Sequence, residues 1–599
     1  MTVASLAILV PLLAAALVAG VRTSIGRAAG EALAVTAAAA TAALCAVLVV
    51  RAGGPLDVLW LGGWAPVDGM PVGIALTPDV MGGGMALFSA LLAVVALLSS
   101  RRLTEAADPL FHALVLVLLA AMVGFCLGAD LFTLFVFFEL MSVCAYALVA
   151  LRSAEPSPLQ GGVNFAITNS LGAILLLFGV GLLYGRTGAL NLARIGDVLS
   201  AQGPPDALVV VAFALVAGGL LVKAAVVPFH FWLADAYAAA SSPVCLLLAG
   251  AFTELGLFGL VRVYWNVFAE PFAGHEGAVR VVFVVLGLAT ALVGAMMALE
   301  QRHLRRMLAF VTTSTIGISL AAIGLLEAHA LAGAMVWALA DGCAKAALFV
   351  GVGALERRFG TIDAGELHGR GRDMPFTGAA FAVAGLAIAG LPPLGPFWGK
   401  GLVDHGAELV PGFAWLPWAI AVPSLLIGAA VLRAGAGIFV GIGEPPRVDP
   451  STREAREEPE PPEGRDPILT AAALLLTLAA VGLGAAPGLL DATLTAAAAA
   501  LDTEAVHAAV LFGAQVTPAE LGAPFPSALA WAIGILSACA AAVVAWIALL
   551  GAARSNAPAP ARSAMQAMRD LHSGHVGDYV LWLAAGFVAL GGALLAGLT

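Results

Sequence analysis

The chain contains only three lysines, Lys223, Lys345 and Lys400, and each lies in or beside a long apolar run. The other 25 basic residues are arginines, and most of them lie between such runs. Arginine keeps its proton in a protein, whereas a buried lysine can release one near neutral pH. A charged side chain at the bilayer centre costs at least about 2.5–3.5 kcal/mol. The three lysines therefore indicate proton transfer, with a structural salt bridge as the alternative for each.

Four further titratable side chains lie in apolar surroundings. Glu139 is central in LFTLFVFFELMSVCAYALVA, and Glu254 lies in LLLAGAFTELGLFGLV. An acid at such depth needs a proton or a nearby cation. His230 and His329 titrate near physiological pH. For both histidines, an ordinary hydrogen-bonded structural role is the alternative.

Two acid–lysine pairs have helical spacing. Asp341 precedes Lys345 by four residues, and Asp404 follows Lys400 by four. This spacing puts both members on one helix face, close enough to pair and to titrate together. A purely structural ion pair is the competing interpretation for both.

Prolines interrupt two of the lysine-bearing segments. Lys223 lies five residues before Pro228, and Lys400 follows Pro392 and Pro393. Interrupted membrane helices are tolerated where they line a polar cavity. A matching pair of broken helices in two halves is typical of inverted-repeat transporters with sites at the membrane midplane.

The elements that hold these residues are predicted to be membrane helices. Of 599 residues, 61% are hydrophobic and 11% charged, and the mean hydropathy is +1.00. Soluble domains carry about 25% charged residues, so a Rossmann domain, a nucleic-acid module or a large extramembrane catalytic unit is excluded. The apolar runs are continuous rather than alternating, which argues against a β-barrel. We therefore predict an all-α polytopic membrane protein.

Sixteen apolar runs reach spanning length, so we expect about 14–16 transmembrane helices. The runs lie near residues 4–21, 29–50, 79–100, 110–129, 131–151, 163–184, 207–227, 243–264, 278–299, 306–326, 328–354, 375–395, 413–442, 467–489, 527–551 and 579–597. All six cysteines fall within apolar runs and no CxxC pair exists, so we expect no metal, no iron–sulfur cluster and no other cofactor in this chain.

The predicted orientation follows from the arginines. Nineteen fall in loops after odd-numbered runs and five, Arg262 among them, in loops after even-numbered runs. Because arginine and lysine are enriched in cytoplasmic loops, the odd-numbered loops are predicted to be cytoplasmic. Both termini should then lie outside a cell membrane.

Several ordered motifs resemble one family. They are KAAVVPFHFWLADAYAAASSPVCLLLAGAFTELGLFGLVRVY, HLRRMLAFVTTSTIGI, CAKAALFVGVGAL and GRGRDMPFTGAAFAVAGLAIAGLPPLGPFWGK. Together they resemble the proton-conducting membrane subunits shared by respiratory complex I, membrane-bound hydrogenases and Mrp-type cation/proton antiporters, over roughly residues 75–440. The resemblance implies that Glu139 and Lys223 are the family's glutamate and its partner lysine. It also implies that Lys345 is the lysine of the central relay and Lys400 the terminal lysine.

The chain departs from the family pattern at two positions. Glu254 stands where the family usually has lysine or histidine, and Asp341 where a histidine commonly precedes the central lysine. Both changes keep a titratable group but replace a neutral or cationic one by an acid. The relay either remains intact with reversed polarity or is impaired.

The resemblance implies five regions. These are N-terminal helices (1–105), a first half-repeat of five helices (106–275), a second half-repeat of five helices (276–442), a charged cytoplasmic linker (443–466) and a C-terminal extension (467–599). Each half should contain one broken helix. The extension is similar to that of chain-5-type subunits of complex I, and its charged stretch before the last run is predicted to lie on the cytoplasmic surface.

The predicted function is proton translocation within a larger membrane complex. Protons would pass laterally through Glu139, Lys223, Glu254, Lys345 and Lys400, with the Glu139–Lys223 pair as a switch. Other membrane subunits would supply energy from redox chemistry or from exchange against sodium, so this chain would hold no catalytic redox site of its own. The alternatives are a stand-alone secondary transporter for an ion or solute and a non-conducting scaffold subunit.

Overall fold

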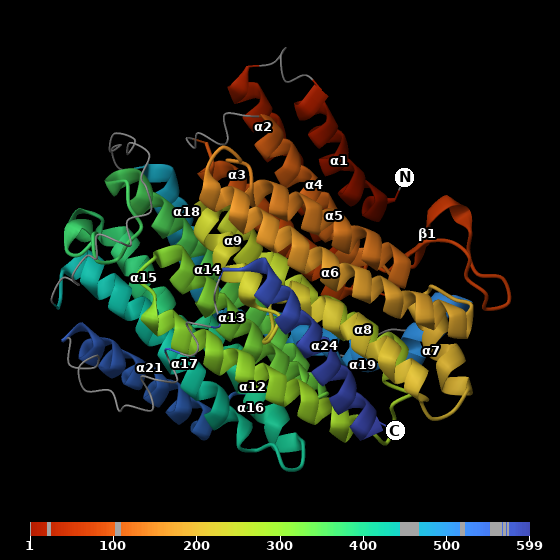
Figure 1. Ribbon diagram of the computed structural model, residues 1–599. Helices are drawn as coiled ribbons and strands as arrows, with labels where there is room; N and C mark the ends of the chain where they lie inside the picture. The colour runs from red at the N-terminus through yellow and green to blue at the C-terminus, as the bar shows by residue number, and fades with distance from the viewer. Residues whose placement is uncertain are drawn as a thin grey trace.

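The computed structural model describes residues 2–20, 26–54, 56–101, 109–443, 466–515, 522–550, 566, 571 and 574–598. The predicted charged linker lies outside the described residues except at its two ends, and so does most of the charged stretch before the last helix. In the described part, long helices pack side by side in one bundle (Figure 1). One two-stranded antiparallel ribbon, β1 (Leu59–Trp60) with β2 (Ala75–Leu76), lies at an end of it.

Thirteen helices in the described part are long and apolar enough to cross a membrane. One of them, Ser242–Phe268, joins α10, α11 and two π-helical stretches. The helices are α1 (Val3–Gly20), α2 (Arg27–Arg51), α3 (Val80–Ser99), α4 (Pro109–Leu127), α5 (Leu131–Val149), α6 (Pro156–Thr187), α10 (Ser242–Leu247) with η3 (Leu248–Phe252), α11 (Thr253–Val263) and η4 (Tyr264–Phe268), α12 (Glu276–Glu300), α13 (Leu304–Ile323), α14 (Ala328–Phe359), α17 (Leu416–Gly435) with η6 (Ala436–Val440), α21 (Ala528–Leu549) and α24 (Val576–Leu598).

Three shorter apolar helices fill the remaining predicted runs, and each is continued by a second helix after a break. They are α8 (Ala207–Lys223) with α9 (Phe231–Ala239), α15 (Pro375–Ala389) with α16 (Gly395–Leu409), and α18 (Pro467–Gly482) with η8 (Leu483–Ala485) and α19 (Pro487–Leu501). The first two breaks lie at the predicted prolines, whereas the third was not predicted. Together with the thirteen long helices, these segments confirm the predicted all-helical membrane fold.

Short helices lie at the ends of the bundle. They are η1 (Leu61–Gly63), α7 (Leu192–Ala201), η5 (Arg370–Asp373) and α20 (Thr503–Phe512). The bend between α19 and α20 is 72°. The hydroxyl of Thr503 donates to Trp265 O, which ties the start of α20 to the end of the membrane segment that holds α11.

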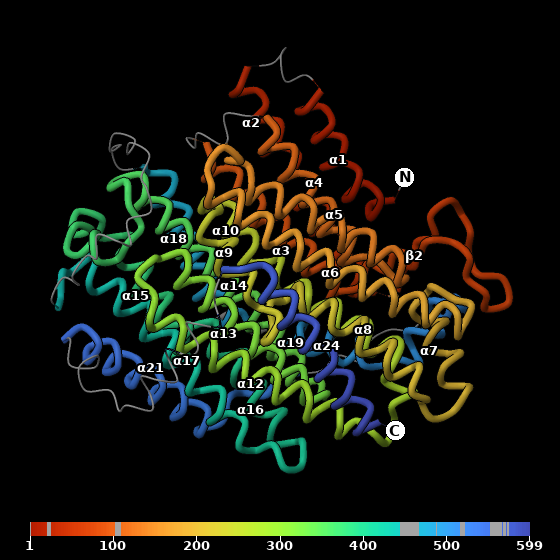
Figure 2. The backbone as a smooth tube through the Cα atoms, in the orientation of Figure 1, coloured from red at the N-terminus to blue at the C-terminus, as the bar shows by residue number. Residues whose placement is uncertain are grey.

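At one end of the bundle, here called the arginine face, arginines join the helix termini through ion pairs: Arg305 with Glu356, Arg357 with Asp466, and Arg358 with Asp373. The opposite face carries β1, α7 and α20. Both chain ends lie on the side of β1 and α7 (Figure 1), and the smooth backbone trace shows the same arrangement (Figure 2).

Glycines bring two helices of the centre into close contact. A Cβ atom added at Gly333 of α14 would lie 2.6 Å from Gly399 O, and one added at Gly399 of α16 would lie 2.8 Å from Gly333 O. Small residues at such crossings let membrane helices pack backbone to backbone. This contact fixes the broken segment that carries Lys400 against the helix that carries Lys345.

Candidate functional site

Lys223 is the last residue of α8 and is fully buried at the first break. Its Nζ donates to Phe138 O of α5 at 2.9 Å and to the hydroxyl of Ser142, one turn further along α5. The same Nζ lies 3.8 Å from the ring centroid of Phe138 and 4.5 Å from that of Phe252. Aromatic faces attract a cation, so the site holds the ammonium group without a carboxylate in contact.

Glu139 follows Phe138 on α5, but it does not touch the lysine. No ion pair shorter than 4.0 Å joins these two described side chains, and Glu139 Oε1 is buried without a hydrogen-bond partner in the described part. A buried carboxylate oxygen without a partner is costly. Glu139 and Lys223, which the sequence predicts to pair, are therefore not paired in this structure.

Side chains from neighbouring segments satisfy the backbone groups that the first break exposes. The indole of Trp232 donates to Val222 O at 3.0 Å, and Val227 N donates to the hydroxyl of Thr290 at 3.0 Å. Non-helical backbone at membrane depth requires such partners. His230, the N-cap of α9, is buried and lies two residues after Pro228.

The central cluster contains one lysine and two acids. Lys345 Nζ lies 2.8 Å from Asp341 Oδ2, one turn earlier on α14, and 3.3 Å from Glu254 Oε1 on α11. It also donates to the hydroxyl of Thr315 on α13 at 3.2 Å. Lys345 and Asp341 are fully buried and Glu254 is 4% exposed. The predicted i, i+4 contact between Asp341 and Lys345 is present.

Lys400 lies in the second turn of α16, just after the second break. Its Nζ donates to Ala389 O at 3.4 Å, at the end of α15, and lies 4.8 Å from the ring of Trp337. It lines a small cavity with Asp404. No ion pair shorter than 4.0 Å joins these two described side chains. Lys400 therefore faces a carbonyl group and an aromatic ring rather than a bound carboxylate.

Two helices connect the three lysine sites. Phe252, which contacts Lys223, precedes Glu254 of the central cluster by two residues. Trp337, which contacts Lys400, precedes Asp341 by four residues on α14. A helix rises 1.5 Å per residue, so these links span about 3 and 6 Å along their axes. The sites follow one another through the interior of the bundle.

His329 lies away from this row, near the face opposite the arginine face. Its Nδ1 is 2.7 Å from Glu327 Oε1, and its ring centroid is 4.8 Å from that of His405. These contacts fit the structural role considered for this histidine.

Several contacts of charged and hydroxyl side chains were not predicted. The expectation that Arg262 lies in a loop is wrong, because it is buried in α11 and pairs with Asp79 at 2.6 and 3.0 Å. The apolar run LGLFGLVRVYW on both sides of Arg262 was a usable signal. Ser142 and Thr315 carry no such signal, since a hydroxyl within an apolar helix is common.

Comparison with known proteins identifies related chains. Residues 128–426 match the family described as "NADH:quinone oxidoreductase/Mrp antiporter, TM". The chain is 31% identical over 377 residues to NADH-quinone oxidoreductase subunit N of Desulforudis audaxviator, covering 62% of this chain and 72% of the relative. It is 28% identical over 392 residues to a Na(+)/H(+) antiporter subunit of Alkalihalophilus pseudofirmus, covering 64% and 76%.

Solved structures share the fold. A chain of the Mrp complex from Dietzia sp. DQ12-45-1b superposes with a TM-score of 0.75 at 29% identity, covering 85% of this chain and all of that one. A chain of respiratory complex I from Thermus thermophilus has a TM-score of 0.61 at 23% identity, covering 80% and 97%. At this lower identity the second likeness bears on the fold alone.

Proposed function

Because the chain belongs to the NADH:quinone oxidoreductase/Mrp antiporter transmembrane family, we propose that it is a proton-translocating or cation/proton-antiporting subunit of a multisubunit membrane complex. Its partners would be the other membrane subunits, and its substrates would be protons and, in an antiporter, a monovalent cation such as sodium. The row of lysine sites, with Lys223 and Lys345 fully buried and Lys400 partly buried, carries this proposal.

The proposed route runs through Glu139, Lys223, Glu254, Lys345 and Lys400, with bound water between them. His230 and Asp341 supply further titratable groups next to this route. Lys223 holds a proton over the rings of Phe138 and Phe252, and an approach of Glu139 would change how readily it lets that proton go. In the central cluster, two acids beside one lysine leave an excess negative charge when all three are ionised. That excess suits the uptake of a proton from Lys223.

We propose that residues 106–275 and 276–442 form an inverted repeat with its broken helices at Pro228 and at Pro392 and Pro393. In support, each half holds five membrane segments, and the fourth segment of each is the broken one. Lys223 precedes its break and Lys400 follows its break. The two lysines therefore occupy different positions in the repeats, which would allow them to serve opposite ends of the route.

We further propose that the chain lies in the plasma membrane with the arginine face in the cytoplasm. The concentration of arginines at the helix ends of that face supports this orientation. Both termini and the cavity described below would then lie outside. The N-terminal helices 1–105 and the C-terminal extension 467–599 would flank the two half-repeats, joined by the charged linker 443–466.

The decisive experiment replaces Lys223 in the assembled complex. Lys223→Ala is expected to abolish pumping or antiport while leaving assembly largely intact. Lys223→Arg keeps the charge but cannot release a proton, so it should also abolish transport. Arg186→Ala, which removes an exposed ion pair with Asp206, is the matched control and should transport normally. Transport retained in Lys223→Arg would contradict the relay.

A second measurement separates a complex subunit from a self-contained carrier. The purified chain alone in lipid vesicles is expected to show no ion exchange, whereas vesicles with the whole complex should show it. Exchange by the chain alone would favour the stand-alone transporter instead.

A further inference from the structure

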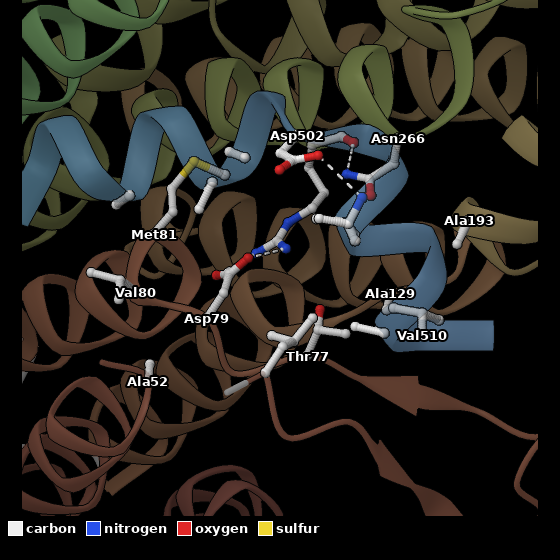
Figure 3. Close-up of a pocket in the computed structure, with 18 of the residues that line it drawn as sticks. Ala52, Thr77, Asp79, Val80, Met81, Ala129, Ala193, Asn266, Asp502 and Val510 are labelled. Atoms are coloured by element: carbon white, nitrogen blue, oxygen red, sulfur yellow. Dashed lines mark hydrogen bonds and ion pairs between the residues drawn. The ribbon is translucent and has the colours of Figure 1, made fainter. Parts of the chain in front are cut away.

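A cavity of about 100 Å³ opens at the face opposite the arginine face. It lies where helices end or begin: α2 ends before it, α3 begins beside it, and the bend between α19 and α20 closes over it. Thr77, Asp79, Asn266 and Asp502 are among the polar residues of its lining (Figure 3). A cavity at the level of the helix ends meets the aqueous phase rather than the hydrocarbon core.

An ion pair between the buried Arg262 and Asp79, which is 29% exposed, forms the inner wall of this cavity. Asp79, the N-cap of α3, also accepts from Gly82 N at 2.6 Å, and it binds both terminal nitrogens of Arg262. Arg262 also donates to Cys126 O at 3.2 Å. Its side chain is 6% exposed, and its Nε has no hydrogen-bond partner in the described part. A fixed, desolvated guanidinium group is a strong barrier to cations.

Arg262 is on the same helix as an acid of the central cluster. Glu254, Phe258 and Arg262 follow one another at intervals of four residues on α11, so they lie near one face of it. Glu254 and Arg262 are about 12 Å apart along the axis. Between them, the guanidinium carbon of Arg262 lies 5.2 Å from the ring centroid of Phe258. Phe258 and Arg262 therefore separate the cavity from the central cluster.

We propose that this cavity is an outer aqueous mouth for hydronium and hydrated monovalent cations, and that the Asp79–Arg262 pair is its closed gate. This proposal rests on the proposed function, since it gives the central cluster a direct branch to the outside. When the pair holds, the positive charge keeps cations away from Glu254. When Arg262 swings from the path, for example toward the carboxylate of Asp502 on the opposite wall, water can reach the cluster.

The test measures passive proton leak in vesicles that contain the whole complex. Without an electron donor or a sodium gradient, a potassium diffusion potential drives protons, and a pH dye reports their entry. Arg262→Gln removes the positive charge that repels cations, so the leak is expected to rise. The expected rise is about tenfold, which corresponds to a barrier lower by 1.36 kcal/mol.

Arg186→Gln is the matched control for charge removal. Arg186 pairs with Asp206 at 3.2 Å on the same side of the molecule, but it is 39% exposed and does not line the cavity. This variant should leak no more than the wild type. An assembled Arg262→Gln complex with wild-type leak would overturn the gate.

A thiol measurement decides the outcome if Arg262→Gln fails to assemble. Ala499 lines the cavity, whereas Ala344 is fully buried beside Lys345. With native cysteine labelling subtracted, Ala499→Cys should react with a membrane-impermeant thiol reagent added outside, and Ala344→Cys should not. Equal protection of both cysteines would overturn the aqueous mouth. Leak through Arg262→Gln together with normal transport by Lys223→Arg would leave the mouth standing and refute the lysine relay.

Discussion

At the scale of single residues, the three lysines have different surroundings. Lys345 contacts two carboxylates, whereas Lys223 and Lys400 contact carbonyl groups and aromatic rings. Removing one partner of a buried ion pair costs about 3–5 kcal/mol, because the other charge stays buried without compensation. The three lysines should therefore differ more in how much they stabilise the fold than in how much they contribute to transport.

Lys345→Met should lower the free energy of unfolding by about 3–5 kcal/mol, because Asp341 and Glu254 lose their counter-ion. Thermal unfolding of the detergent-solubilised protein would measure the loss. Adding Asp341→Asn should recover part of it, since one uncompensated charge disappears. Lys400→Met is the matched control and should cost less. Equal losses for the two single variants would contradict the role given to the central ion pairs.

His303, outside the membrane segments at the N-cap of α13, gives a pH prediction. Burial and the neighbouring Arg305 and Arg306 lower its pKa from 6.5 to about 3. The unfolded chain then binds more protons than the folded one between these values, so stability falls as pH drops from about 6.5 toward 3. The neutral ring accepts from Arg306 N at 3.3 Å, and protonation would remove that acceptor.

His303→Asn should reduce the fall in melting temperature between pH 7.5 and pH 5, because asparagine caps a helix without titrating in this range. Melting curves of both proteins across the pH series would measure the difference. Parallel curves would mean that other groups dominate the acid sensitivity.

At the scale of the helices, the C-terminal extension covers both proline breaks. A Cβ atom added at Gly534 of α21 would lie 2.7 Å from Gly390 O and 3.2 Å from Pro392, at the second break. One added at Gly586 of α24 would lie 2.6 Å from Pro228, at the first. Close packing of a helix over each break shields it from lipid, so these two helices should stabilise the site.

Gly586→Leu should therefore lower the melting temperature and reduce transport, because the new side chain forces α24 away from Pro228 and Phe229. Gly592→Leu on the same helix is the matched control, since nothing lies within 4 Å of its added Cβ. Melting curves and ion flux of the assembled complex would compare the two. Similar behaviour of both variants would show that the contact over the first break is dispensable.

The sequence predicted the breaks that contain proline beside a lysine, but not the break in α18–α19. That segment reads as uninterrupted apolar sequence apart from Gly482, Gly484 and Pro487. Pro487 was a usable signal, because the residue before a proline is disfavoured in the α region, and Ala486 has φ −97° and ψ 93°. The Asp79–Arg262 pair was missed for a different reason. Its partners are 183 residues apart, and no local pattern connects them.

At the scale of the whole molecule, the lengths of the apolar runs predicted the helical membrane architecture. Each predicted run contains a helix, because a helix satisfies the hydrogen bonds of its backbone groups within the segment, and the hydrocarbon core offers them no other partner. The contact between Asp341 and Lys345 was predicted from their spacing, but the contacts of the three lysines with other helices were not. Those contacts depend on how far each side chain reaches across the bundle, which spacing along one helix does not determine.

The proposed orientation gives a last prediction. Three crossings, α18–α19, α21 and α24, separate Gly443 from the C-terminus, so these two points should lie on opposite sides of the membrane. Alkaline phosphatase fused to the C-terminus is expected to be active, and a green fluorescent protein there to be dark, because only the former matures outside the cytoplasm. Fusions after Gly443, whose neighbour Leu549 ends α21 at the arginine face, should give the reverse pattern.

The same result at both fusion points would contradict an odd number of crossings between them. A dark phosphatase and a bright fluorescent protein at the C-terminus, with the reverse after Gly443, would keep the fold and invert its orientation. In that second case the cavity beside Arg262 would open to the cytoplasm, and thiol labelling of Ala499→Cys from outside would fail with it.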